Sequence, residues 1–279
     1  MNISKVVLFI ACTLFCANSY AATADIKAAD NQAGFQVIST KVNYTETGNG
    51  ILGSPTGTLD TETGSVRGFA LSASRMWGAR NYYLESSFSR NNGHTKYIGA
   101  SIGGGPYGSV VTQSGATLTD FNLRLGRGVV INDDEAGMYD QVMAVPYFEL
   151  GYHRWDRGVN YGETYTHEYF GIGILGQYSP SSMLVISANA LIGQTFNSNI
   201  SVAGPGGFSG SLGDSTLNKF GLKFDFKITG RLHANIGIDY TSFEYGMSDL
   251  YPIGGGFVAW EPDSSTTYTT YNVGLGYAF

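Results

Sequence analysis

The chain ends in a stretch that alternates strictly between two kinds of residue: TYNVGLGYAF, residues 270–279. In steps of two from the last residue, one set holds the large apolar side chains Phe279, Tyr277, Leu275, Val273 and Tyr271. The other set is small or polar. Because a β-strand places successive side chains on opposite faces, this stretch predicts a strand with one apolar and one polar face.

The same alternation appears ten times along the chain. It covers roughly residues 35–46, 64–77, 81–92, 116–129, 141–155, 165–178, 182–194, 215–228, 232–245 and 266–279. The connections alternate between short turns and long loops rich in Gly, Ser, Thr and Asn, which span about 47–63, 93–115, 156–164, 197–214 and 246–265. Such alternation with an even strand number is typical of membrane barrels. The predicted fold class is therefore all-β: a transmembrane antiparallel β-barrel of about ten strands, with eight or twelve as neighbouring alternatives.

The distribution of charge indicates which strand face meets lipid. Only 14% of the 279 residues are charged, against an ordinary ~25%. On the strand face that carries the apolar residues, every charged residue lies near a predicted strand end. These residues are Arg67, Arg75, Arg90, Arg127, Arg154, Glu168 and Glu244. A basic residue at the bilayer midplane of a barrel costs about 2–4 kcal/mol, so this is the pattern expected of a lipid-facing surface. Aromatic residues also gather at strand ends, as in an interfacial girdle: Trp77, Tyr82, Trp155, Tyr178 and Tyr277.

The opposite face of the strands carries charged residues in mid-strand, and we expect this face to line the lumen. These are Lys41, Glu85, Asp120, Arg124, Glu149, Lys219, Lys223, Asp225, Lys227 and Asp239. Buried charges need partners, and neighbouring strands offer Glu85 with Arg124 and Lys219 with Asp239. The favoured interpretation is a charge network that fills and rigidifies a narrow, non-conducting lumen. A small hydrated pore and a catalytic cluster are the alternatives.

The chain divides into three segments. Residues 1–21 have the features of a cleaved signal peptide: Lys5 near the start, an apolar stretch from Val6 to Phe15, and a small-x-small site before Ala22. Residues 22–34 are expected to form a short periplasmic segment and residues 35–279 the barrel. Both cysteines, Cys12 and Cys16, fall inside the leader. The mature chain would then contain no disulfide and no thiolate metal site.

With a leader, ten amphipathic strands and a terminal Tyr277-Ala278-Phe279, the chain resembles the outer-membrane β-barrels of Gram-negative bacteria, in the small porin-like, opacity-like and OmpA-barrel group. The resemblance spans about residues 35–279 and is a pattern more than a motif. It implies residence in the bacterial outer membrane, among outer-membrane lipids and lipopolysaccharide. It also implies that Leu275, Tyr277 and Phe279 form the signature read by the barrel-assembly machinery.

Enzymes with this architecture use motifs that the sequence does not contain. Omptin-type proteases need acid pairs and an Asp-x-His arrangement, yet the chain has no Asp-x-Asp and no Asp two residues before a His. Lipid hydrolases of the outer membrane use a Ser two residues after a His, and none of His94, His153, His167 and His233 has one. His153 near Glu149 could be oriented as a base, but a structural role is favoured. No enzymatic activity is therefore expected, and an outer-membrane protease or lipid hydrolase is the least favoured alternative.

The long loops are the candidates for specific binding, because binding residues concentrate on loops held by a rigid scaffold. Aromatic residues there are expected to contact a host or surface ligand: Tyr107, Tyr161, Tyr165, Tyr251, Phe257 and Trp260. The predicted function is a structural or surface-binding, adhesin-like barrel, with a small porin-like channel as the alternative. A net charge of −6 without a Lys/Arg cluster disfavours nucleic acid as a partner. No cofactor or metal motif is present, so none is expected.

Overall fold

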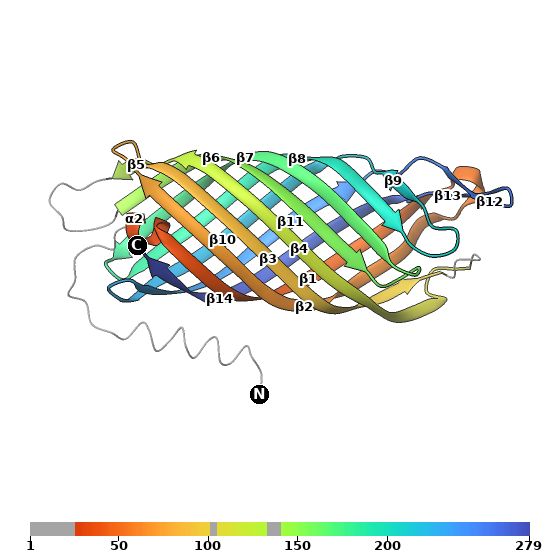
Figure 1. The fold of residues 1–279 in the computed structure, drawn as a ribbon, viewed down its shortest axis with the longest axis horizontal. Helices are drawn as coiled ribbons and strands as arrows, with labels where there is room; N and C mark the ends of the chain where they lie inside the picture. Colours follow the sequence, from red (N-terminus) through yellow and green to blue (C-terminus); the bar gives the residue numbers. More distant parts are fainter. Residues whose placement is uncertain (1–25, 101–104, 133–140) are drawn as a thin grey trace, which may run out of the picture.

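The structure, a computed structural model, describes residues 26–100, 105–132 and 141–279, which form a closed antiparallel β-barrel (Figure 1). Its ten long strands are β1 Gln32–Asn49, β2 Thr56–Trp77, β3 Tyr82–Gly99, β4 Val110–Arg127, β6 Gln141–Arg157, β7 Glu163–Ser181, β8 Leu184–Val202, β10 Thr216–Thr229, β11 Leu232–Tyr245 and β14 Asp263–Ala278. Around the ring they follow the order β10, β11, β14, β1, β2, β3, β4, β6, β7 and β8, and β8 pairs with β10 to close it. The prediction of a ten-stranded barrel is confirmed.

Shorter strands and helices lie at the two ends of the barrel. β5 Val129–Asn132 pairs with β6, and β9 Ser209–Ser211 pairs with β8. β12 Tyr251–Gly254 and β13 Phe257–Ala259 form a separate hairpin, and a short 3-10 helix, η1, covers Ile51–Gly53. A helix of five residues, α2 Ile26–Asp30, precedes the first strand. No helix within the described part of the chain is long and apolar enough to cross a bilayer.

The outer surface of the barrel carries an apolar band on the half nearer the chain termini. Its side chains alternate along each strand with lumen-facing ones, and they include Phe35, Val37, Phe69, Leu71, Phe121, Leu125, Phe148, Leu150, Phe170, Ile172, Ile174, Ile192, Phe220, Leu222, Ile238, Val273 and Leu275, all exposed. A closed ring of strands with an apolar outside satisfies every backbone group internally, as a bilayer requires. This half of the barrel therefore spans the membrane, with α2, Phe279 and the short turns on the periplasmic side.

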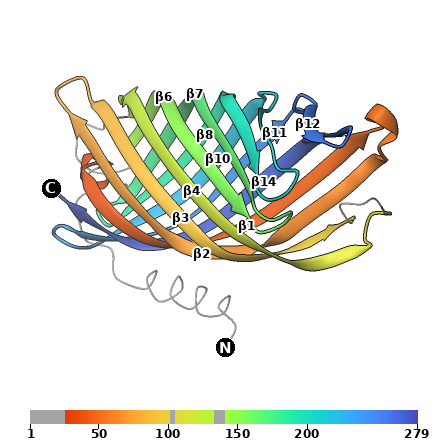
Figure 2. The same ribbon diagram turned by 45° about the vertical axis from the view of Figure 1, so that its right-hand side comes forward.

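Beyond the apolar band the strands continue as a polar wall. Outward positions there are polar or charged on neighbouring strands, for example Lys41 and Thr45 of β1, Ser65 of β2, and Asn92 and Lys96 of β3. All five predicted long loops are consequently shorter than expected, because β1–β2, β3–β4, β6–β7, β8 and β14 extend into them. Figure 2 shows β1–β2 and β3–β4 reaching well past the other strands. The sequence pattern does not reveal these extensions because the outward face is polar there and the inward face mixes charged and aromatic residues, so hydrophobicity no longer alternates although the hydrogen bonding continues.

Pro146 lies inside β6, where a proline removes a ladder hydrogen bond. The register explains why it is tolerated. The partner strand on one edge of β6 changes at this point. β4 pairs with β6 as far as Gly126 opposite Tyr147, and β5 pairs with β6 from Val129 opposite Ala144. Pro146 therefore sits where one partner strand replaces another, and its missing N–H falls at a break in the ladder.

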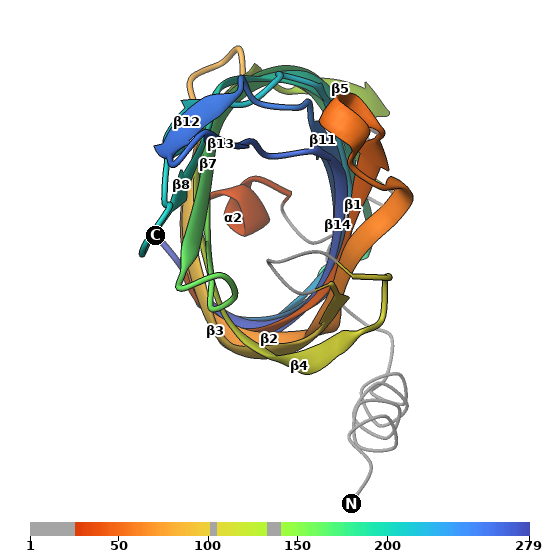
Figure 3. The same cartoon turned by 90° about the vertical axis from the view of Figure 1, so that its right-hand side faces the viewer.

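The N-terminal part of the described chain does not extend away from the barrel. Residues 22–34 were expected to form a short periplasmic segment, but β1 already begins at Gln32 and residues 26–30 form α2. Viewed along the barrel, α2 lies inside the ring of strands (Figure 3), with Ile26 and Asp30 buried. The predicted leader, residues 1–21, lies outside the described residues.

Candidate functional site

Two polar clusters cross the lumen, and the first lies at the level of the membrane. Arg124 of β4 faces Glu85 of β3 in the strand register, and its Nη1 lies 3.2 Å from Glu85 Oε2. The Nε of Arg124 donates to the buried carboxylate of Glu149 on β6. Lys219 of β10, which is separated from β6 in the ring by β7 and β8, reaches Glu149 with 2.9 Å between Nζ and Oε1. The four charges thus form one network that ties four strands together.

Tyrosines complete this membrane-level network. The hydroxyl of Tyr169 donates to Glu149 Oε1 over 2.7 Å, and Tyr83 donates to Glu85 Oε2 over 2.7 Å. Tyr147 lies under the Arg124 guanidinium, with 4.9 Å from the charge centre to the ring centroid. Each buried charge therefore meets an opposite charge, a hydroxyl or an aromatic face, which is what makes burial of ions tolerable.

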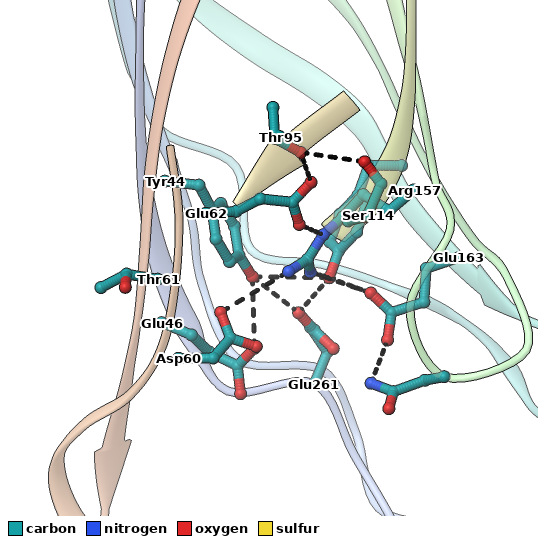
Figure 4. Close-up of polar contacts among 12 residues, drawn as sticks. Tyr44, Glu46, Asp60, Thr61, Glu62, Thr95, Ser114, Arg157, Glu163 and Glu261 are labelled. Carbon is teal, nitrogen blue, oxygen red and sulfur yellow. Dashed lines mark hydrogen bonds and ion pairs between the residues drawn. The ribbon is translucent and has the colours of Figure 1, made fainter. Parts of the chain in front are cut away.

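The second cluster closes the extracellular half of the lumen, and we call it the Arg157 hub (Figure 4). The Arg157 guanidinium donates to Glu62 of β2 and to Glu163 of β7, each over 2.8 Å, and to the Tyr165 hydroxyl over 3.0 Å. Asp60 lies 3.5 Å from its Nη2. Tyr44 stacks on the cation with 4.4 Å between Cζ and ring centroid, and Trp155 lies on it at 5.0 Å. Aromatic faces and carboxylates together enclose the guanidinium.

The hub is strongly acidic in composition. Glu46, Asp60, Glu62, Glu163 and Glu261 surround the single guanidinium drawn in Figure 4. Tyr165 and Tyr44 both donate to Glu261 Oε1, the latter over 3.2 Å. Burial, followed by the charge of Glu163, raises the pKa of the Glu261 carboxyl to about 8. Burial likewise raises the pKa of Glu46, Asp60 and Glu163. These groups lie beyond the membrane band, and a pKa of about 8 favours the protonated form of Glu261 at neutral pH.

An aspartate–histidine pair lies between the two clusters. Asp120 Oδ1 is 2.7 Å from His153 Nδ1, and the opposite ring nitrogen of His153 lies 3.2 Å from the Tyr268 hydroxyl. The His153 ring also lies 5.0 Å from that of His167, whose Nδ1 is 2.7 Å from the Tyr245 hydroxyl. Both ring nitrogens of His153 therefore have a hydrogen-bond partner, Asp120 on one side and Tyr268 on the other. His153 lies near Asp120 and not, as expected, near Glu149.

A cavity of about 260 Å³ occupies the lumen beneath the Arg157 hub. Its lining includes Asp120, Arg124, His153, Lys219, Asp239 and, at the periplasmic end, Asp30 of α2. The space is polar and roomy enough to hold water. Among the described residues, no three His, Cys, Asp or Glu side chains are arranged as a metal site.

The structure corrects three predictions about the lumen. Lys41 is exposed and shares the outward parity of Phe35 and Val37, because in β1 the residues that face the lumen are Ile38, Val42 and Tyr44. Lys219 contacts Glu149 and not Asp239, which instead accepts a hydrogen bond from Asn272 over 2.9 Å. Trp155, predicted for the interfacial girdle, lies inside the hub.

Two of the remaining predicted lumen charges, Lys223 and Asp225, make local contacts. Asp225 pairs with His233 at 2.6 Å from Nδ1, and Lys223 lies 3.8 Å from Asp225. They belong to the periplasmic third of the lumen and join neither cluster.

The predicted loop contacts separate into three groups. Phe257 and Tyr161 are the most exposed, at 72% and 73%, and Tyr107 is exposed with its hydroxyl 2.9 Å from Thr61 Oγ1. Tyr251 stacks on Phe208 with 5.2 Å between ring centroids, so it holds the β12–β13 hairpin in place, and Trp260 is half-buried. Tyr165 is fully buried in the hub. Its prediction as a loop contact is wrong because β7 begins at Glu163, two residues earlier.

The strand pattern does not mark most residues of the hub, because they fall in segments that the sequence predicts to be loops. A signal was nevertheless present: Tyr44 and Glu46, Asp60 and Glu62, Trp155 and Arg157, and Glu163 and Tyr165 are each two residues apart. Residues two apart lie on the same face of a strand, so these pairs continue the series of lumen-facing residues past the apolar band.

No family model and no curated protein sequence matches the chain. Among solved structures, the chain is similar to the outer membrane protease OmpT from Escherichia coli, with 9% identity, 89% of this chain and 96% of that chain covered, and a TM-score of 0.57. It also matches Ail, the attachment invasion locus protein of Yersinia pestis, with 11% identity, 89% and 98% coverage and a TM-score of 0.33. OprG from Pseudomonas aeruginosa matches with 14% identity, 89% and 97% coverage and a TM-score of 0.34.

At these identities the likeness to OmpT shows the fold alone. Together with the closed ring of ten strands and the apolar outer band, it defines the class: the protein is a bacterial outer-membrane β-barrel.

Proposed function

We propose that this protein is a non-conducting, non-enzymatic barrel that presents a binding surface on its extracellular loops, as an adhesin does. The observation that carries the proposal is the contrast between a lumen filled by buried ionic clusters and loop tips with large exposed apolar side chains. Arg157, Glu62, Trp155 and Tyr165 are almost completely buried in the extracellular part of the lumen. A conducting pore would need a hydrated path there.

The loop surface centres on the β12–β13 hairpin. Ile253, Phe257 and Val258 are exposed at its tip, and Leu250 is exposed just before it. Gly254, Gly255 and Gly256 all have positive φ, so the turn between the two strands can be made only with glycine-like backbone freedom. Exposed apolar patches on a soluble surface mark interaction sites. Aliphatic side chains beside an aromatic ring favour a protein partner on a host cell or matrix over a sugar.

The outer wall supports a second contact, with lipopolysaccharide. Lys41, Arg67 and Arg90 face outward on the adjacent strands β1, β2 and β3, at the upper border of the apolar band. The register places Arg67 opposite Ser39 and Arg90 opposite Phe69, so the three cations are diagonal neighbours. Phosphates of the outer leaflet lie at this height, and we assign them as the partners of this basic patch.

The adhesive function is tested by replacing Phe257 and Val258 with Ser and measuring binding of whole bacteria to host cells and to immobilised matrix proteins. We expect binding to fall to the level of cells lacking the protein. Leu52→Ser, at a different exposed loop, is the matched control and should bind normally. Equal binding by both variants would contradict the proposal, as would a steady single-channel conductance of the purified protein.

A further inference from the structure

The helix α2 occupies the periplasmic mouth of the barrel without belonging to its wall. The strand pairing of β1 starts at Gln32, which lies opposite Ala278 of β14 and Ser74 of β2. The ring is therefore complete without residues 26–30. A helix of five residues has no stability of its own, so α2 is held in place by its contacts with the barrel.

Those contacts consist of two buried apolar residues, Ile26 and Ala29, and a few hydrogen bonds. Ile26 is fully buried in the same apolar cluster as Met76, Tyr83, Met143 and Leu175, which point inward from four strands. The backbone N–H of Ile26 donates to Gln141 Oε1 over 3.4 Å, which is a long hydrogen bond. At the other end of α2, Gln177 Nε2 donates to Asp30 Oδ1 over 2.8 Å.

The polar contact of Asp30 is incomplete. Asp30 Oδ2 and Gln177 Oε1 are both buried and have no hydrogen-bond partner. Unsatisfied buried oxygens weaken the docked state relative to a state in which water reaches them. The same carboxylate lines the lumen cavity, so α2 forms the floor of that cavity.

We propose that α2 is a releasable stopper: it closes the periplasmic mouth of the barrel, and its release admits small polar solutes from the periplasm into the lumen cavity. The Arg157 hub closes the cavity on the extracellular side, so the two closures act in series. Release of α2 breaks no strand pairing, whereas opening of the hub requires separation of buried ion pairs. The periplasmic closure is therefore the one that yields first.

The test uses a cysteine reporter in the full mature protein, reconstituted in lipid vesicles. Ser87→Cys lines the cavity, and Ser65→Cys is exposed on the outer wall. Each is combined with Ile26→Asp, which puts a carboxylate into the apolar socket, or with Lys27→Asp, which puts it on the exposed side of α2. The rate of modification by a charged methanethiosulfonate reagent is measured by mass spectrometry.

We expect Ile26→Asp to accelerate labelling of Ser87→Cys by about tenfold or more, because an unpaired carboxylate in an apolar socket costs more than the ~1.4 kcal/mol that a tenfold change represents. Lys27→Asp leaves the buried Ile26 in place and should change the rate far less than Ile26→Asp does, and Ser65→Cys should react at one rate throughout. Heat-modifiable migration on gels checks that each variant is folded. If Ile26→Asp does not fold, deletion of residues 26–30 replaces it.

Equal labelling of Ser87→Cys with intact and with displaced α2 would overturn the stopper. A measurement of single-channel conductance distinguishes a failure of the stopper from a failure of the proposed non-conducting barrel. If the unaltered protein both conducts and labels rapidly, the lumen is open and both proposals fail. If it does not conduct and Ile26→Asp has no effect on labelling, the closed lumen stands and only the stopper fails.

Discussion

Arg157 of β6 and Glu62 of β2 lie on strands that are separated in the ring by β3 and β4, yet Nε donates to Oε2 over 2.8 Å and neither side chain is exposed. This pair spans the lumen above the membrane. It joins two walls of the barrel that share no backbone hydrogen bond, so the cross-section of the protruding half depends on it.

Replacement of Arg157 should destabilise the barrel strongly. Arg157→Ala leaves the buried carboxylates of Glu62 and Glu163 without a cation, and breaking a buried pair in this way costs about 3–5 kcal/mol. Arg154→Ala is the matched control: it lies on the same strand, but its side chain is 47% exposed and pairs with Asp156. An exposed pair is worth about 0–1 kcal/mol. Urea titration followed by tryptophan fluorescence measures both, and similar losses would contradict the role of the hub.

The stability of the hub should fall as pH rises. The pKa of Glu261 is about 8 in the folded protein, raised by burial, so the folded state keeps a proton that the unfolded chain has lost. Stability from this group is full below the unfolded pKa and disappears as pH rises through about 8. Glu261→Gln keeps the hydrogen-bonding shape without the titration. We expect the melting temperature of the unaltered protein to fall between pH 5 and pH 9, and that of Glu261→Gln to fall less. Parallel curves would argue against protonation of Glu261.

Charge reversal of the basic patch should weaken binding of lipopolysaccharide. Each basic residue at an anionic lipid surface contributes about 1 kcal/mol, so loss of Lys41, Arg67 and Arg90 predicts a roughly hundredfold weaker affinity. Arg75→Glu on β2 is the control, since it faces outward at the periplasmic border of the apolar band. Titration of the refolded protein with lipopolysaccharide at low and high salt gives the readout. The variant with the charges of Lys41, Arg67 and Arg90 all reversed should also lose the salt dependence of binding. An unaltered affinity would exclude this patch as the binding site for lipopolysaccharide.

The terminal aromatic residue should affect assembly more than stability. Phe279 is 62% exposed on the outer face, so Phe279→Ala removes little packing from the folded barrel. The resemblance to outer-membrane barrels nevertheless implies that it is read during assembly. We expect heat-modifiable protein to accumulate more slowly in cells carrying Phe279→Ala than in cells carrying Val273→Ala, which alters an outward residue of the same strand. Equal accumulation would count against the signature.

The strand pattern predicted the membrane half of the fold closely. Periplasmic strand ends, such as Trp77 of β2 and Leu232 of β11, agree with the structure to within a few residues. In this half one face meets lipid and the other meets the lumen, so hydrophobicity alternates. In the protruding half the outward face is polar and the inward face mixes carboxylates with aromatic rings. The predicted strand therefore ends at Glu46, although β1 continues to Asn49.

The pairing of the lumen charges could be predicted only where the partners lie side by side on adjacent strands. Glu85 and Arg124 are such a pair, and they were matched from the estimated depth of two consecutive strands. Lys219 was assigned to Asp239 on the same reasoning, but its contact is Glu149, across the lumen. A long side chain reaches over a narrow barrel as easily as along its wall, and depth alone does not choose between the two.

By itself, then, the sequence determined the number of strands and which side of each strand meets lipid. Both follow from a two-residue period that each strand carries locally. Only the tertiary structure decided which residues meet inside. Closure of the ring brings Arg157, Glu62 and Glu261 together from distant strands and folds α2 back into the mouth. Such contacts depend on the register and diameter of the whole barrel, which no single strand encodes.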